Sequence, residues 1–185
     1  MEDTFRNQTN EPFVLGFVAT CSGSGKTTLI EKLIIQLKSR GYRVGALKHD
    51  VHQFEMDTEG KDSYRFTKAG ADQVMIASAN KLGMVRILHE EMKMAEILRL
   101  FEDVDFIFLE GFRDSGYPKI EIHRKGINTS LLCNDPNSAP QRFYAVASDE
   151  AISATIPVFN LNDVEGIADW IEKLAKQNQK TLCGQ

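Results

Sequence analysis

The segment from Ser22 to Thr28 has the residue types that bind a phosphate chain. Backbone N–H groups of a glycine-rich turn can converge on one anion, and the start of a following helix favours negative charge at the same point. Lys26 supplies a mobile cation for the outer phosphates, and the Thr27 hydroxyl is placed to ligate Mg²⁺. The sequence therefore predicts a nucleotide-binding loop made of Ser22, Gly23, Ser24, Gly25, Lys26, Thr27 and Thr28.

This loop departs from the full phosphate-loop pattern at one position. The pattern has a glycine five residues before Gly25, where this chain carries Thr20. The alternative interpretation is a serine- and glycine-rich turn that caps a helix. The flanking segments favour phosphate binding, because an apolar run of strand length, 13–19, precedes the turn and a helical pattern follows it.

A metal-bound nucleotide also needs an acidic residue at the carboxyl end of a neighbouring buried strand. The run 104–109 is the most apolar in the chain and is followed by Glu110 and Gly111. Ligands of open parallel sheets lie beyond the carboxyl ends of the strands, and five strand residues span about 16 Å. Glu110 is therefore predicted as a catalytic and metal-binding partner of Lys26 and Thr27, whereas Asp105 lies at the opposite edge. Exposure of Glu110 at a strand end without a ligand is the alternative.

Asp50 is a further metal candidate, since it follows the strand 43–48 and should emerge at the same edge as Glu110. It could hold Mg²⁺ through water or orient the attacking water. Lys48 and His49 directly precede it. The acidic segment around His52 does not match a zinc spacing, and a solvated loop is the favoured interpretation.

A second candidate surface follows that acidic segment. Lys61, Arg65 and Lys68 recur at helical spacing and form one basic face, next to Asp62. A solvated face is the default interpretation. The sharper hypothesis is that this basic face is an anion site for a second phosphorylated ligand.

The identity of the base is not encoded in a recognisable motif. Guanine-specific loops often carry Asn-Lys-x-Asp, and neither the segment 80–83 nor the segment 147–149 completes that pattern. The residues alone therefore leave GTP and ATP both open.

Composition restricts the class of protein. The chain has 185 residues, a net charge of −4, and an ordinary share of apolar and charged residues for a globular fold. No general attraction to nucleic acid is expected, and no apolar run is long enough for a membrane span. The polar start of the chain is unlike a secretory signal, and three cysteines without a CxxC pair argue against a disulfide framework. We expect a cytoplasmic protein.

Strand-like and helix-like segments alternate, which indicates an α/β domain with a mainly parallel sheet of the P-loop NTPase type flanked by helices. We expect a flexible leader at 1–12, one nucleotide-binding domain at 13–176 and a frayed tail at 177–185. The expected strands are 13–19, 43–48, 73–77, 84–88, 104–109, 119–124, 143–147 and 156–161. Helices are expected directly after the phosphate loop, over residues 61–69, over residues 89–101, and starting after Asn162 or Asp163.

The two strands 73–77 and 84–88 are expected to form an inserted β-hairpin. A hairpin outside the main sheet presents an unpaired edge that another subunit can extend. The sequence therefore predicts a homodimer formed through this segment.

Taken together, the motifs resemble the MobB family of molybdopterin-guanine dinucleotide biosynthesis adapter proteins over nearly the whole chain, from about Phe13 to Leu174. The phosphate loop alone is not specific, but the ordered set of blocks is. These blocks are 22–28, 45–49, 60–64, 68–71, 110–112, 147–149 and 162–166.

The resemblance implies a GTP-binding protein with weak hydrolysis, Mg²⁺ near Thr27 and Glu110, and a homodimeric state. It implies that the protein assists the guanylyltransferase MobA in attaching GMP to molybdopterin. It also makes Lys48, His49 and the segment 60–65, with Lys61, Asp62 and Arg65, candidates for a second ligand or a partner. A P-loop small-molecule kinase and a non-catalytic interaction module stabilised by nucleotide are the alternatives. No arginine that would stabilise the transferred phosphoryl group can be assigned; Arg113 is the nearest in sequence to Glu110, and a partner is the other possible source.

Overall fold

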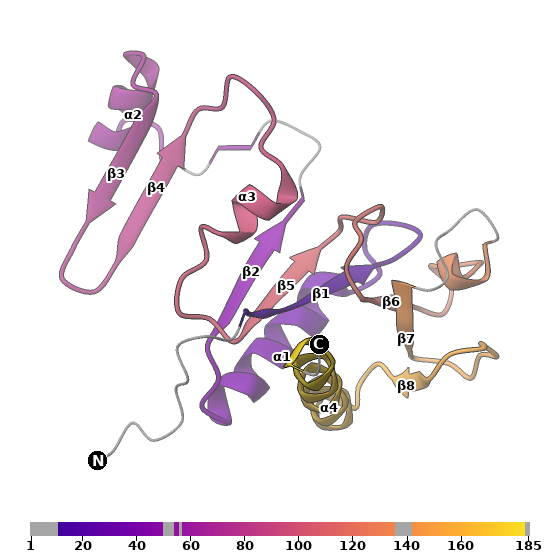
Figure 1. The fold of residues 1–185 in the computed structure, drawn as a ribbon. Coiled ribbons are helices and arrows are strands. Elements are labelled where there is room, and N and C mark those ends of the chain that lie inside the picture. The colour runs from indigo at the N-terminus through magenta and orange to yellow at the C-terminus, as the bar shows by residue number, and fades with distance from the viewer. Residues whose placement is uncertain (1–10, 50–53, 56, 136–141, 184–185) are drawn as a thin grey trace. The chain divides into compact units, whose positions relative to one another are not determined.

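The computed structural model of the chain describes residues 11–49, 54–55, 57–135 and 142–183, with the side chains described as far as residue 179. The chain divides into two compact units, one made of residues 1–49 and 103–185 and the other of residues 50–102. Figure 1 shows the strands and helices of each unit along the chain.

The first unit is built on a six-stranded sheet in which every neighbouring pair of strands is parallel. The spatial order is β2-β5-β1-β6-β7-β8. This arrangement confirms the predicted mainly parallel, P-loop NTPase-like sheet. The strands are β1 (Phe13–Val18), β2 (Val44–Lys48), β5 (Phe106–Glu110), β6 (Lys119–His123), β7 (Phe143–Ser148) and β8 (Val158–Asn160).

Two helices, α1 (Lys26–Ser39) and α4 (Val164–Cys183), pack together against one face of this sheet (Figure 1). Apolar residues at helical spacing form the buried sides of these helices. The phenylalanines of β1 and β5 are buried as well, because the helices cover this face of the parallel sheet. The fully buried members of this core include Leu15, Phe17, Leu33, Leu37, Phe108, Ile167 and Ile171.

The other face of the sheet is covered locally by irregular chain. The short 3₁₀ helix η1 (Leu132–Asn134) and the segment 152–156 pack against Val18, Phe143 and Val146. Glu121 on β6 is buried there and accepts the backbone N–H groups of Leu132 and Cys133 at 2.6 and 2.9 Å. The Glu121 carboxylate therefore anchors the start of η1.

The end of α1 has a simple backbone cause. Gly41 adopts a left-handed conformation, with φ of +88°. The N–H groups of Gly41 and Tyr42 then close on the carbonyls of Lys38 and Leu37, as in a Schellman motif. Gly41 thereby ends α1 and directs the chain into β2.

The second unit contains α2 (Asp62–Lys68), the hairpin of β3 (Gln73–Ala77) and β4 (Leu82–Arg86), and α3 (Met94–Leu98). The hairpin was predicted, but its second strand begins at Leu82 rather than at residue 84. The backbone N–H of Ser78 donates to the carbonyl of Lys81 at 2.8 Å, so the turn is tighter than expected and β4 starts earlier.

The helix predicted at 89–101 is wrong in length, since only Met94–Leu98 is helical. The backbone N–H of Lys93 donates to the Glu96 carboxylate at 2.8 Å, which marks the start of the helix. Leu100 and Phe101 then donate to carbonyls three residues back, so the last turn tightens and the helix ends.

The last helix begins at Val164, as predicted after Asp163, whose backbone carbonyl accepts the N–H of Ile167 at 3.1 Å. It continues to Cys183, through residues 177–183 that the sequence predicted as a frayed tail. None of the helices in the described residues is long and apolar enough to cross a membrane.

Candidate nucleotide-binding site

The loop between β1 and α1 has the backbone of an anion-binding turn. Gly23 and Gly25 adopt left-handed conformations, with φ of +77° and +87°, which side-chain-bearing residues rarely take. Gly25 is the N-cap of α1, and its carbonyl accepts the first helical hydrogen bond, from Leu29 at 3.0 Å. The N–H groups of the first helical turn therefore have no acceptor within the helix and are available to an anion.

Thr27 and Glu110 meet at the edge of this loop. The Thr27 hydroxyl lies 2.9 and 3.0 Å from the two carboxylate oxygens of Glu110, although 83 residues separate them in sequence. The contact forms because β5, which ends at Glu110, pairs directly with β1. A hydroxyl and a carboxylate side by side are the oxygen ligands that Mg²⁺ prefers, so these residues fit the predicted metal.

Asp105 lies at the opposite end of β5, as predicted. Its carboxylate accepts the backbone N–H of Arg43 at 2.7 Å, just before β2 begins. Asp105 thus anchors the entry of a neighbouring strand and does not compete with Glu110 for the site.

Lys26 is the first residue of α1, and its ammonium group donates to the carbonyl of Cys21 at 3.2 Å. The cation therefore lies over the loop itself. Helix α1 thus brings Lys26 and Thr27 to the loop, and β5 brings Glu110 to it.

Lys48 and His49 lie at the same edge of the sheet as Glu110. This is because β5 pairs with β1 on one side and with β2 on the other. Lys48 is in register with Glu110, and the backbone N–H of His49 donates to the Glu110 carbonyl at 2.9 Å. The His49 ring lies 4.9 Å from the ring of Phe112. Gly111 has a φ of +88°, and a Cβ there would lie only 3.3 Å from His49 Cβ, so both the backbone conformation and the close approach favour glycine.

The structure does not place the remaining predicted residues at this loop. Asp50 and His52 lie outside the described residues. Lys61, Asp62 and Arg65 belong to the second unit, at the start of α2, where Arg65 pairs with Asp62 at 3.5 Å. No group of three or more His, Cys, Asp or Glu side chains that could hold a metal occurs in the part of the chain that the structure describes.

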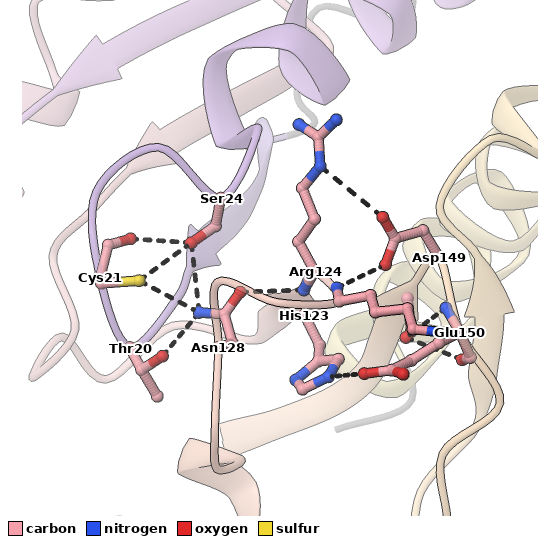
Figure 2. Close-up of polar contacts among 10 residues, drawn as sticks. Thr20, Cys21, Ser24, His123, Arg124, Asn128, Asp149 and Glu150 are labelled. Carbon is pink, nitrogen blue, oxygen red and sulfur yellow. Dashed lines mark hydrogen bonds and ion pairs between the residues drawn. The ribbon is translucent and has the colours of Figure 1, made fainter.

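Asn128 is a site residue that sequence reasoning missed. It is buried in the turn after β6, and its side-chain amide donates to Thr20 Oγ1 at 2.6 Å and to Ser24 Oγ at 3.2 Å. Its carbonyl oxygen accepts the backbone N–H of Arg124 at 2.9 Å. Figure 2 shows the Asn128 side chain directed from this turn toward Thr20 and Ser24 of the phosphate loop, so that it joins the two segments.

The contact with Asn128 explains the departure at Thr20. In the described residues, only Asp103 and Phe112 combine a side chain with a positive φ, so Thr20 does not need the conformational freedom of glycine. Its hydroxyl serves instead as an anchor for the loop. The only sequence signal for Asn128 is its place in a polar turn around Gly126. This signal is weak, because such a turn has no hydrophobic periodicity that would mark a buried position.

The turn after β6 is also tied to the end of β7. Asp149 accepts the backbone N–H of Lys125 at 2.7 Å and lies 3.6 Å from Arg124 Nε, and His123 Nε2 lies 2.9 Å from Glu150 (Figure 2). Asp149, considered above as the end of an incomplete base-recognition motif, holds this turn in place. The other candidate, Asn80 with Lys81, is located at the tight turn of the hairpin in the second unit.

Comparison with known proteins gives a consistent result. Residues 14–149 match the family described as MobB, molybdopterin guanine dinucleotide synthesis protein B. The chain is 37% identical over 167 residues to the molybdopterin-guanine dinucleotide biosynthesis adapter protein of Escherichia coli K12, covering 86% of this chain and 93% of that protein. It is 34% identical over 153 residues to the protein of the same name in Haemophilus influenzae, covering 82% and 83%.

The fold has solved counterparts as well. A crystal structure described as molybdopterin-guanine biosynthesis protein B (mobB) superposes with a TM-score of 0.68 at 30% identity, covering 89% of this chain and 99% of that one. The similarity therefore extends beyond the phosphate loop to most of the chain.

Proposed function

This chain belongs to the MobB family of molybdopterin guanine dinucleotide synthesis proteins, and from that premise we propose that it is a GTP-binding adapter acting in the cytoplasm. In this role it assists a MobA-type guanylyltransferase in attaching GMP to molybdopterin. The assignment of GTP rests on the family, because no base-recognition motif is complete in the sequence.

One observation carries the nucleotide-binding part of the proposal. The Thr27 hydroxyl and the Glu110 carboxylate lie within hydrogen-bonding distance at the start of α1, and the ammonium group of the preceding residue, Lys26, lies over the loop at the Cys21 carbonyl. A Mg²⁺ bound there would neutralise phosphate charge. The helix start and Lys26 would stabilise the charge that develops on the phosphoryl oxygens during slow hydrolysis of GTP.

The residues at the carboxyl end of β2 support a second role. Lys48 and His49 are exposed and lie against Glu110 and Phe112, directly beside the nucleotide site. We assign these two residues to the second ligand or the partner enzyme. Lys61, Asp62 and Arg65 are proposed for the same purpose on the second unit.

We also propose that the protein acts as a homodimer assembled through the hairpin. The hairpin forms a separate two-stranded sheet, so neither of its edges is paired in the described chain. Met75 lies opposite Met84, and Ala77 lies opposite Leu82, with Met75 and Leu82 exposed by 56% and 66%. A second copy of the hairpin would cover this apolar face.

The test is a binding titration of GTP and ATP, with and without Mg²⁺, on the wild type and Lys26→Ala. We expect GTP to bind more tightly than ATP, and Lys26→Ala to weaken GTP binding by about tenfold or more, because a charge-assisted contact to phosphate is lost. Lys32→Ala, an exposed lysine on the same helix, is the matched control and should bind as the wild type does. Equal affinity of the wild type and Lys26→Ala would contradict the proposal.

The adapter role needs a second readout. In a reconstituted reaction with a MobA-type guanylyltransferase, GTP and molybdopterin, the wild type should increase the yield of the dinucleotide cofactor and Lys26→Ala should not. Full stimulation by Lys26→Ala would mean that nucleotide binding is not part of the function.

A further inference from the structure

Arg124 places a cation on the side of the phosphate loop that is opposite Glu110. Its guanidinium Nη1 atom lies 3.6 Å from the point where a Cβ on Gly25 would be. Gly25 closes the loop and caps α1, so this arginine is next to the residues that present their N–H groups to an anion. Figure 2 shows the Arg124 side chain extending from the turn that carries Asn128.

The strand order explains this position. β1 pairs with β5 on one side and with β6 on the other, and Arg124 is the first residue after β6. In a parallel sheet the residues after these strands meet at the same edge. The phosphate loop is therefore flanked by a carboxylate from β5 and a guanidinium from β6.

Arg124 is held before any ligand arrives. Its backbone N–H donates to Asn128 Oδ1 at 2.9 Å, and the amide of the same Asn128 binds the loop at Thr20 and Ser24. Its Nε lies 3.6 Å from Asp149, whereas Nη1 is the atom that faces Gly25. One side of the guanidinium thus meets a protein carboxylate and the other side faces the loop, in a side chain that is 49% exposed.

We propose that Arg124 binds a phosphate group of the nucleotide through its guanidinium, on the face of the loop opposite Thr27 and Glu110. This inference rests on the proposed nucleotide-binding function and adds the arginine that sequence reasoning did not find. Guanidinium groups recognise phosphate oxygens with directed N–H donors, and pre-positioning by Asn128 and Asp149 reduces the entropy lost on binding. Arg113, the arginine nearest to Glu110 in sequence, lies instead 3.8 Å from Asp135.

The test compares Arg124→Gln with Lys125→Gln, a neighbouring exposed residue that loses the same charge and contacts Asp149 through its backbone rather than its side chain. Titration of GDP and GTP should show affinity about tenfold or more lower for Arg124→Gln, and within about twofold of the wild type for Lys125→Gln. Arg124→Lys should recover part of the loss, because it restores the charge without the fork of donors. Thermal unfolding confirms that each variant is folded.

The contact itself is tested by the ³¹P resonances of GDP bound at saturation. At least one phosphorus resonance should shift in Arg124→Gln and stay in place in Lys125→Gln. Unchanged resonances, or an affinity of Arg124→Gln equal to that of the wild type, would overturn the proposal for Arg124 alone. A wild type that binds neither GDP nor GTP would instead overturn the proposed function.

Discussion

At the scale of single residues, Glu110 has two neighbours of different kinds. Its carboxylate accepts the Thr27 hydroxyl, and its backbone carbonyl accepts the N–H of His49. The side chain is therefore available to a metal on one side, while the backbone keeps β2 and β5 aligned on the other. A substitution that removes only the charge should separate these two roles.

We predict that Glu110→Gln loses the Mg²⁺-dependent part of GTP binding, about tenfold in affinity, because a neutral amide is a poor ligand for a hard cation. The measurement is the GTP affinity with excess Mg²⁺ and with EDTA. Asp105→Asn makes the same change of charge at the other end of β5 and should keep the Mg²⁺ dependence. An equal Mg²⁺ effect in Glu110→Gln and the wild type would remove Glu110 from the metal site.

Asn128 should matter both for stability and for binding. Asn128→Ala leaves the buried hydroxyl of Ser24 and the N–H of Arg124 without this partner, and we expect a loss of about 1–3 kcal/mol in the free energy of unfolding. Asn128→Asp keeps the oxygen that accepts the backbone N–H of Arg124, but it replaces the donating amide with a second oxygen that faces the hydroxyls of Thr20 and Ser24. It should therefore lower the free energy of unfolding at least as much as Asn128→Ala. Urea unfolding measures both, and an Asp variant as stable as the wild type would contradict the assigned contacts.

Cys133 gives a pH dependence with a definite sign. Burial, with a contribution from the nearby Glu121 carboxylate, raises the pKa of Cys133 from 9.0 to about 12. The folded protein then holds a proton that the unfolded chain releases, so this contribution to stability is complete below pH 9 and falls by about 1.4 kcal/mol per pH unit between pH 9 and 12.

The check is urea unfolding of the wild type and Cys133→Ala at pH 8 and pH 10. The stability difference between the two proteins should change by about 1 kcal/mol to the disadvantage of the wild type at pH 10. Cys21→Ala, at an exposed cysteine, serves as the control and should follow the wild type. A constant difference between the wild type and Cys133→Ala would contradict the raised pKa.

At the scale of elements, α1 and α4 are joined by charge as well as by their apolar sides. Arg40 follows α1 and pairs with Asp169 and Glu172 of α4 at 2.7 and 2.6 Å. The side chains of Arg40 and Glu172 are only 23% and 16% exposed, so water and salt screen this network less than an isolated surface pair.

We expect Arg40→Met to lower the free energy of unfolding by about 1 kcal/mol, since the partly buried Glu172 and the exposed Asp169 lose their common partner. Arg65→Met, which removes a pair between side chains that are 74% and 82% exposed, should change it by less than about 0.5 kcal/mol. Urea unfolding at low and high salt distinguishes them. Equal effects of the two substitutions would mean that the pairing between α1 and α4 contributes no more than a surface contact.

The elements differ in how far the sequence specifies them. Apolar runs bounded by turn residues were enough to predict every strand of the main sheet within a few residues. The length of α3 was overestimated, because apolar residues at helical spacing continue past the helix into the tighter turn at Leu100 and Phe101. Asn128 and Arg124 were missed because their partners Thr20, Ser24 and Gly25 are about a hundred residues away, and no local pattern records such a pairing.

At the scale of the whole molecule, the proposed homodimer depends on the hairpin. We predict that the double variant Met75→Lys with Leu82→Lys is monomeric, because charges on the exposed apolar face oppose its burial against a second copy. Ile35→Lys changes an exposed apolar residue of α1 in the same way and should remain dimeric. Light scattering at micromolar concentration measures this, and a monomeric wild type would contradict the dimer.

The place where the second unit enters the chain has a consequence for deletions. Residues 50–102 leave after the carboxyl end of β2 and return before the amino end of β5, and these two strands are parallel neighbours. Five residues at ~3.3 Å each mean that the connection must run back over about 16 Å of sheet. Joining His49 directly to Asp103 would therefore pull the two strands out of register and move Glu110 away from Thr27. A shortened chain needs a bridge of at least about five extended residues in place of the excised unit.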